Sequence, residues 1–211
     1  LNMKKILFLI FIASSVFGQN QRYIDSVKAL TKSKVDTVRF SAYSELVWVL
    51  KETNKTEALE YGNNLLTEAT KTAKQKWIAQ GYNDLGIIYI RSGDLNKALF
   101  NIEKSLAIRE KLGDKKDIAS SLSKIANIKT EDGKYGEALE MQLRVLRLYE
   151  ELNIQPYIAH TCNNIGQLYN NINKYSLSNT YLMRAYTIEK EIGDVYGMPI
   201  TLAVIGSNYS D

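Results

Sequence analysis

Few side chains in this sequence of 211 residues are suited to catalysis or to metal binding. It contains one cysteine, Cys162, and one histidine, His160. A single cysteine excludes an intramolecular disulfide, and a single histidine leaves no cluster of His and Cys ligands for zinc. The carboxylates are dispersed, and no glycine-rich segment precedes a lysine as a nucleotide-binding loop would require. The sequence therefore predicts no catalytic residue, no metal site, no cofactor and no enzymatic activity.

Polar groups recur at helical spacing and could instead bind a partner. In each of three predicted helices, four residues at steps of three, four and three lie on one face. The three sets are Gln80, Asn83, Ile87 and Ile90; Ser120, Ser123, Asn127 and Thr130; and His160, Asn163, Gln167 and Asn170. Side-chain amides both donate and accept hydrogen bonds, so they can pair with a peptide backbone. A merely solvated face would also be polar, although Lys and Glu would then be more common. The predicted ligand-groove residues are Gln80, Asn83, Ile87, Ser123, Asn127, His160, Asn163, Gln167 and Asn170.

The helices that would carry these groups belong to an internal repeat. Four segments line up at an offset of 40 residues: Trp77 to Tyr89, Asp117 to Lys129, Tyr157 to Tyr169 and Gly197 to Tyr209. Downstream, Ala98-Leu99 recurs as Ala138-Leu139, and an earlier copy runs from about Thr37 to Lys76. Only 2 of the 211 residues are proline, which suits a chain that is helical almost throughout. A fixed period of this length predicts a solenoid built from helix pairs.

Apolar residues within one copy follow the spacing of a single helix face. Steps of four, three and four residues connect Ile158, Cys162, Ile165 and Tyr169. Cys162 should therefore be a buried and unreactive thiol. In the array as a whole, the residues expected in the core are Leu85, Tyr89, Ile125, Ile165 and Tyr169.

Glycines mark two further features of each copy. Gly166 occupies a position where the first helix should closely approach the second, and Gly86 and Gly206 occupy the same position in other copies. The glycines of the turns should adopt left-handed caps, both within a helix pair and between pairs: Gly93, Gly113, Gly133 and Gly193.

These residues resemble the tetratricopeptide repeat. The pattern consists of Leu85-Gly86-x-x-Tyr89, followed by Ala98, Ile102 and Ser105, and it recurs as Ile165-Gly166-x-x-Tyr169 with Ser178, Leu182 and Ala185. The middle copy departs from it at Ala126, Lys129, Gln142 and Val145. The period of 40 is similar to that of long-helix variants of the family. The resemblance implies an all-α, right-handed superhelical solenoid of antiparallel helix pairs, whose concave groove holds a protein or peptide.

The expected organisation begins with a secretory signal peptide over residues 1–18. Lys4 and Lys5 precede an unbroken small or apolar run from Ile6 to Phe17, which is too short to span a membrane, and Gly18 is the expected cleavage site. An apolar core helix is the alternative for this run. A lead-in helix is expected within residues 19–36. The array should occupy 37–211, with copies at 37–76, 77–116, 117–156 and 157–196 and an incomplete copy at 197–211.

The net charge of the chain and its expected export limit the classes of partner that it could bind. Without Lys4 and Lys5 the chain has 25 basic and 23 acidic residues, a net charge of +2, so no nucleic-acid partner is expected. The signal peptide implies a periplasmic or otherwise extracytoplasmic location. In the incomplete copy Leu202, Ile205 and Tyr209 should lack a covering helix, which predicts fraying or self-association at that end.

Two functions fit these features. The array resembles the amino-terminal sensor region of bacterial two-component histidine kinases, which implies a binding and sensing module of a larger signalling protein. In that case any kinase activity and any membrane segment would lie beyond Asp211. The alternative is a stand-alone periplasmic scaffold that holds a protein complex together. The sequence does not identify the bound partner in either case.

Overall fold

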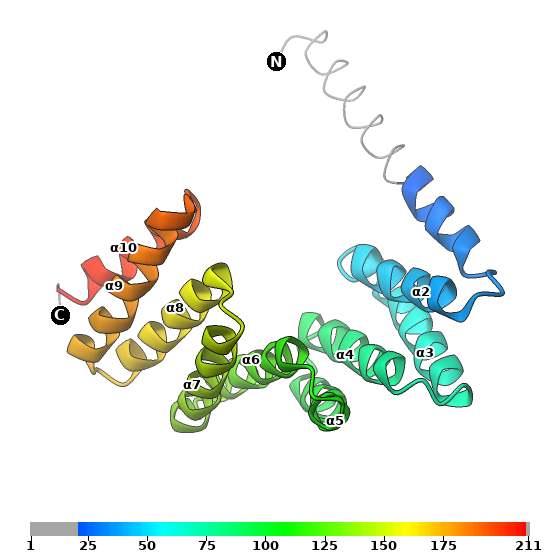
Figure 1. The fold of residues 1–211 in the computed structure, drawn as a ribbon, viewed down its shortest axis with the longest axis horizontal. Coiled ribbons are helices and arrows are strands. Elements are labelled where there is room, and N and C mark those ends of the chain that lie inside the picture. Colours follow the sequence, from blue (N-terminus) through cyan, green and yellow to red (C-terminus); the bar gives the residue numbers. More distant parts are fainter. Residues whose placement is uncertain (1–20, 210–211) are drawn as a thin grey trace, which may run out of the picture. The chain divides into compact units, whose positions relative to one another are not determined.

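The computed structural model describes residues 21–209, and every regular element in that range is a helix. A helix over residues 21–30 is followed by α2 (Asp36–Leu50), α3 (Lys55–Lys71), α4 (Gln75–Arg91), α5 (Leu95–Leu112), α6 (Lys115–Glu131), α7 (Tyr135–Glu151), α8 (Gln155–Asn171), α9 (Tyr175–Ile192) and α10 (Gly197–Ser207). Figure 1 shows the short turns that connect them. The expected signal peptide lies outside the described residues. The all-helical solenoid class predicted from the sequence is confirmed.

The chain forms two compact units. Unit 1 ends at Asp94 and contains the 21–30 helix with α2, α3 and α4, while unit 2 starts at Leu95 and contains α5 to α10. Within unit 2, α6 packs on α7 and α8 packs on α9 as helix pairs, and α7 also contacts α8. Within unit 1, α3 contacts both α2 and α4. Each unit is therefore a stack in which every helix buries one face against its neighbours in the chain.

Apolar side chains at the predicted spacing form the core of each unit. Leu85, Ile125 and Ile165 are buried, and Tyr89 and Tyr169 are half-buried. The first helix of the chain joins the core of unit 1 through Val27, which packs in a cluster with residues of α2, α3 and α4. Local sequence fixes several helix starts: the Asn54 side chain accepts a hydrogen bond from the Glu57 backbone N–H, and Asp114 does the same for Asp117.

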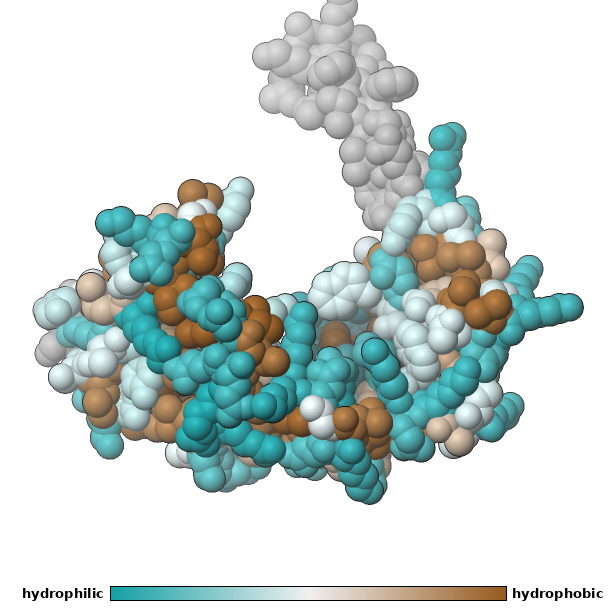
Figure 2. Space-filling view, viewed as in Figure 1, coloured by the Kyte–Doolittle hydropathy of each residue, from teal (hydrophilic) through white to brown (hydrophobic). Residues whose placement is uncertain are grey.

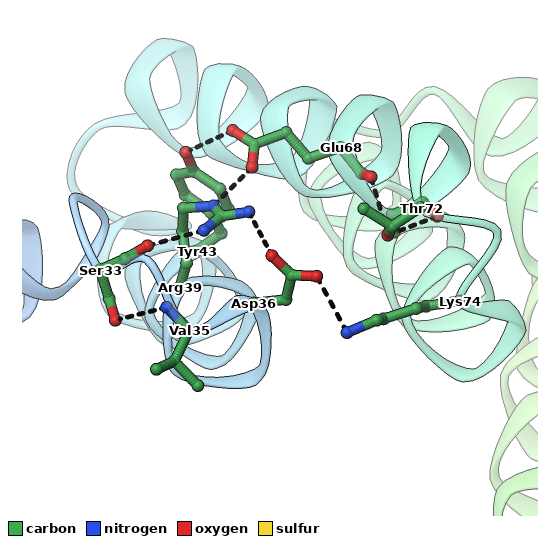
Figure 3. A network of polar contacts seen from close by, with 9 residues as sticks. Ser33, Val35, Asp36, Arg39, Tyr43, Glu68, Thr72 and Lys74 are labelled. Atoms are coloured by element: carbon green, nitrogen blue, oxygen red, sulfur yellow. Dashed lines mark hydrogen bonds and ion pairs between the residues drawn. The ribbon is translucent and has the colours of Figure 1, made fainter.

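A polar network fixes the entry into α2 in unit 1 (Figure 3). The Arg39 guanidinium donates to Glu68 Oε2 on α3 at 2.5 Å, to the Ser33 carbonyl at 2.6 Å and to Asp36 Oδ1 at 2.8 Å. Tyr43 donates its hydroxyl to the other Glu68 oxygen at 2.9 Å. Burial, with help from that carboxylate, raises the pKa of Tyr43 to about 12. One arginine thus ties the connection before α2 to the helix pair that follows.

Every connection between successive helices from α3 onward contains one residue with a positive φ. These residues lie 20 positions apart, with φ between 52° and 74°: Ala73, Gly93, Gly113, Gly133, Asn153, Asn173 and Gly193. Glycine adopts this left-handed conformation without steric cost, whereas a Cβ atom makes it unfavourable. The predicted glycine caps are therefore present, and the same geometry is imposed on three residues that are not glycine.

Ala73→Gly should raise the free energy of unfolding by about 0.5–1 kcal/mol, because relief of the left-handed strain exceeds the entropic cost of glycine. Urea unfolding of both proteins measures the difference. Ala107→Gly is the matched control, since Ala107 is exposed inside α5 and its replacement should lower stability by about 0.5–1 kcal/mol. An equal loss at both positions would show that Ala73 carries no strain.

Each helix pair meets the next one through a different pair of side chains. In unit 1, Trp77 packs beside Ala69. In unit 2, the Arg109 guanidinium donates to Ser121 Oγ at 2.9 Å, and the Tyr149 and Tyr157 rings stack with centroids 4.8 Å apart. The last of these contacts is the hydrogen bond that Thr201 donates to Glu189. In each contact one residue comes from the second helix of a pair, and these residues lie 40 positions apart in the chain: Ala69, Arg109, Tyr149 and Glu189. They are small, cationic, aromatic and anionic in turn. If two copies that are not neighbours in the chain packed together, a buried charged side chain would lack its partner or a cavity would remain. These contacts therefore favour the observed order of repeats.

The repeated glycine has a structural role in one copy that it lacks in another. A Cβ atom on Gly166 would lie 2.6 Å from Leu182 Cγ, so α8 and α9 approach each other as predicted. The prediction is wrong for Gly206, where a Cβ would meet nothing within 4 Å. Gly206 lies on α10, which packs mainly on the preceding helix α9 and also contacts α8.

The expectation for the last helix is also corrected in part. Ile205 is only 9% exposed because α10 packs on α9 and α8. Leu202 and Tyr209 are exposed, as predicted, and Tyr209 is 79% accessible. Figure 2 shows hydrophobic surface over the α8–α10 end of the face that it draws. The exposed large apolar residues from Ile192 onward are Ile192, Val195, Tyr196, Ile200, Leu202 and Tyr209.

Candidate functional site

Five of the nine predicted groove residues line two cavities, and four line neither. In unit 1, Gln80, Asn83 and Ile87 line one cavity of about 270 Å³ between α2 and α4. In unit 2, Asn127 and Gln167 line another of about 290 Å³. The remaining predicted residues, Ser123, His160, Asn163 and Asn170, line neither of these cavities.

The cavity in unit 1 combines an aromatic ring with buried polar atoms. Trp48 is 57% exposed, and the Lys51 ammonium lies 3.4 Å from the centre of its ring. Asn83 donates to Asp84 Oδ1 at 3.3 Å, while its own Oδ1 atom finds no hydrogen-bond partner among the described residues. Asn83 is only 6% exposed, so the expectation of a solvent-facing amide is wrong at this position. It is buried because α4 packs against both α2 and α3.

The cavity in unit 2 is lined mainly by amides from α6, α7 and α8, and we call it the amide cleft. Its lining residues are Asn127, Thr130, Glu131, Gln142, Asn164, Gln167, Leu168 and Asn171. Asn127 and Gln167 are exposed, as the stripe predicted, and Leu168 forms a buried apolar wall with Ala126 and Ala138. Asn164 and Asn171 extend the amide lining beyond the predicted stripe. The arrangement can offer donors and acceptors together to a polar ligand.

Gln142 is the member of the amide cleft that the groove prediction missed. Its side chain is 1% exposed, and its Nε2 atom donates to Asn127 Oδ1 over a long 3.4 Å. Its Oε1 atom has no hydrogen-bond partner within the part of the chain that the structure describes. The equivalent positions of the neighbouring copies hold Ile102 and Leu182, both fully buried. A glutamine at an apolar position of the repeat was thus the sequence feature that could have identified it.

Asn163 and Asn170 hold α10 in place. Asn163 donates to Glu189 Oε1 at 2.7 Å, and its own Oδ1 lies 2.9 Å from the Thr201 hydroxyl. Asn170 donates to Asn208, which in turn donates to Ser178 Oγ at 2.8 Å. Two members of the predicted stripe therefore form contacts between helices, and the side-chain nitrogen of each already donates a hydrogen bond.

The reactive residue types are poorly placed for chemistry. Cys162 is fully buried, and burial raises the pKa of its thiol to about 11, so the thiolate is scarce at neutral pH. His160 is exposed and faces Asn164, 3.4 Å from ring nitrogen to amide, and partial desolvation lowers its pKa. Within residues 21–209 no three His, Cys, Asp or Glu side chains gather closely enough to hold a metal ion. None of the helices described there has the length and apolar character needed to cross a bilayer.

Comparison with known proteins identifies the repeats. Family profiles of the tetratricopeptide repeat match residues 79–112 and 117–191. No curated protein sequence matched. Among solved structures, BtubC (BKLC) from P. vanneervenii is similar, with a TM-score of 0.79 and 20% identity over 92% of this chain and 81% of that one.

Two other structures are similar over smaller parts of their own length. A signal-transduction ATPase from Pyrococcus horikoshii that has a tetratricopeptide repeat sensor gives a TM-score of 0.82 and 17% identity, over 95% of this chain but 31% of that one. A Rap protein complexed with Competence and Sporulation Factor gives a TM-score of 0.62 and 14% identity, over 90% of this chain and 58% of that one. At these identities the likeness establishes the fold alone.

Proposed function

We propose that this tetratricopeptide-repeat protein, a protein-interaction module by its fold, binds an extended peptide segment of a partner protein in the amide cleft of α6, α7 and α8. The observation that carries the proposal is the cleft lining, in which five of the eight residues are Asn or Gln. A peptide presents alternating N–H and C=O groups, and amides can pair with both. A surface kept only for solubility would carry charged groups instead. The solved complex of a Rap protein with its factor offers a precedent for a bound partner on a similar fold.

Two exposed cleft residues provide the test. Replacing Asn127 and Gln167 by alanine removes two side chains that face solvent, together with the acceptor of the long 3.4 Å hydrogen bond from buried Gln142, so the free energy of unfolding should fall by about 1 kcal/mol or less. Binding should weaken by about 0.5–1.5 kcal/mol for each hydrogen bond lost. A pull-down from the native host, with the recovered partner identified by mass spectrometry, compares this variant with the wild type.

The control variant changes the same residue types elsewhere. Asn63→Ala combined with Gln75→Ala removes one exposed Asn and one exposed Gln from unit 1, and neither residue lines a cavity described above. The control should recover the partner as the wild type does. Equal recovery by the cleft variant would mean that the amides are only solvated and that recognition lies elsewhere on the chain.

We further propose an extracytoplasmic setting for this module, supported by the basic, apolar and small-residue pattern of residues 1–18. N-terminal sequencing of the protein exported by its host would test cleavage after Gly18. In that setting the module serves as the sensing region of a larger signalling protein, such as a sensor histidine kinase, or as a stand-alone scaffold. A membrane segment followed by a kinase or DNA-binding domain, encoded beyond Asp211, favours the first function.

The exposed face of α10 is a second candidate contact surface, with self-association as its proposed use. It includes Leu202 and Tyr209. The equivalent residues of α8 are covered by α9: Cys162 is fully buried, and the Tyr169 ring stacks on Tyr181 with centroids 5.6 Å apart. Dissociation of a dimer by Leu202→Glu in sedimentation experiments would support this use, and a monomeric wild type would exclude it.

A further inference from the structure

The amide cleft contains a buried acceptor that has no hydrogen-bond partner among residues 21–209. Gln142 projects from α7, is 1% exposed and lines the cavity, and the acceptor is its Oε1 atom. A buried polar group without a hydrogen bond destabilises the folded protein. The neighbouring copies avoid this cost with Ile102 and Leu182. A ligand that donates a hydrogen bond to Oε1 would remove this cost.

The charges around the cleft favour one kind of ligand. Glu131, in the last turn of α6, is the one charged residue among the described residues that line the cavity. The turns that follow α6 and α8 contain Lys134 and Lys174; neither lysine lines the cavity, and the Lys134 ammonium pairs with Asp132 at 2.5 Å. An anionic ligand would meet the Glu131 carboxylate with no cation in the lining to offset it. A cation would meet that carboxylate together with the Gln142 oxygen.

We propose that the amide cleft is a specificity pocket for a basic side chain, Lys or Arg, of the bound peptide. The proposal rests on the function proposed above and adds the chemistry of the ligand. The cationic group pairs with the Glu131 carboxylate and, when the Gln142 side chain turns toward the cavity, also donates to Gln142 Oε1. The cavity of about 290 Å³ gives room for such a side chain, and Leu168 offers apolar surface for its methylene groups.

Blocked peptides of the form Ac-Gly-Gly-Xaa-Gly-Gly-NH2, with Lys, Arg, Gln or Glu at Xaa, are the probes. NMR titration of the intact chain follows the side-chain NH2 resonances of Gln142, assigned through their loss in Gln142→Met. The Lys or Arg peptide should shift these resonances and bind about tenfold more tightly than the Gln peptide, and the Glu peptide should bind most weakly. Equal binding of Lys, Gln and Glu peptides would overturn the proposal.

Two variants separate recognition from folding. Gln142→Met removes an unsatisfied polar group, so the protein should be at least as stable as the wild type while its preference for Lys over Gln disappears. Glu131→Gln should weaken the Lys peptide several-fold and leave the Gln peptide unchanged. Glu140→Gln makes the same charge change on α7 outside this cavity, and it should alter the binding of neither the Lys peptide nor the Gln peptide. An unfolded Gln142→Met protein would show that the glutamine is structural and contradict the proposal.

The outcomes also distinguish this proposal from the function on which it rests. If the Gln peptide shifts the cleft resonances as strongly as the Lys peptide, the cleft binds peptides without the proposed selectivity. If no peptide shifts them but the pull-down still depends on Asn127 and Gln167, the partner is recognised without a basic side chain in the pocket. Either result rejects the basic pocket and leaves the binding module in place.

Discussion

Gly166→Leu should lower the free energy of unfolding by about 3 kcal/mol, the upper end of the usual cost of overpacking. Even a Cβ atom on this residue would lie 2.6 Å from Leu182 Cγ and 3.3 Å from the Ser178 carbonyl oxygen. Leu182 is fully buried and cannot move aside into solvent. The substitution must therefore separate α8 from α9. Urea unfolding monitored by circular dichroism gives the magnitude, and the midpoint should fall without loss of helix content in the folded state.

Gly206→Ala is the matched control, because it lies at the same position of the next copy. Nothing would contact its new Cβ atom within 4 Å, and alanine favours a helix more than glycine does. This variant should be as stable as the wild type or slightly more stable. If Gly166→Leu also left the unfolding midpoint unchanged, the close approach of α8 and α9 would be wrong.

Thr201→Val should lower stability by about 1–3 kcal/mol and release α10 from the array. The Glu189 carboxylate is 2% exposed, and it accepts from Thr201 Oγ1 at 2.8 Å and from Asn163 Nδ2 at 2.7 Å. Valine has nearly the same shape as threonine but no donor, so the variant leaves a buried carboxylate with one hydrogen bond fewer. Hydrogen exchange across α10 should accelerate more than exchange across α8.

Thr161→Val provides the comparison for this second experiment. Thr161 is equally buried at the same repeat position, but its hydroxyl donates to the Tyr157 carbonyl of its own helix at 2.7 Å. That carbonyl already accepts the backbone hydrogen bond of the helix, so the loss should be smaller, about 1 kcal/mol or less. Equal costs at the two positions would mean that Glu189 does not depend on Thr201.

The fold could be predicted in detail because repetition made local patterns unambiguous. The stripe through Ile165, the close approach at Gly166 and the left-handed turn at Gly133 each follow from one copy and are checked by another. Ala73 and Asn153 were missed as left-handed residues, because their side chains do not indicate a positive φ. Both residues align, at the repeat period, with the turn glycines of other copies, and that alignment would have predicted their positive φ. The division into two units at Asp94 has no counterpart in the periodicity.

The site could be predicted only in part, because helical periodicity tells which face a residue occupies but not what covers it. Asn127 and Gln167 are exposed, as the stripe predicted, whereas Asn163 is engaged by Glu189 and Thr201 from two other helices. Those contacts join residues 26 and 38 positions apart, which a pattern within one helix does not describe. Gln142 shows the converse, since a departure from the repeat marked the most unusual buried group in the cleft.

Site-specific photo-crosslinking tests the central claim most directly. A p-benzoylphenylalanine placed at Gln167, on the rim of the amide cleft, should crosslink to the partner protein upon irradiation, and mass spectrometry should locate the attachment in an extended segment. The same group at Thr180, exposed on α9 outside the cleft, should give no crosslink to that segment. Crosslinks to the partner from Thr180 but not from Gln167 would contradict the claim that the amide cleft is the binding site.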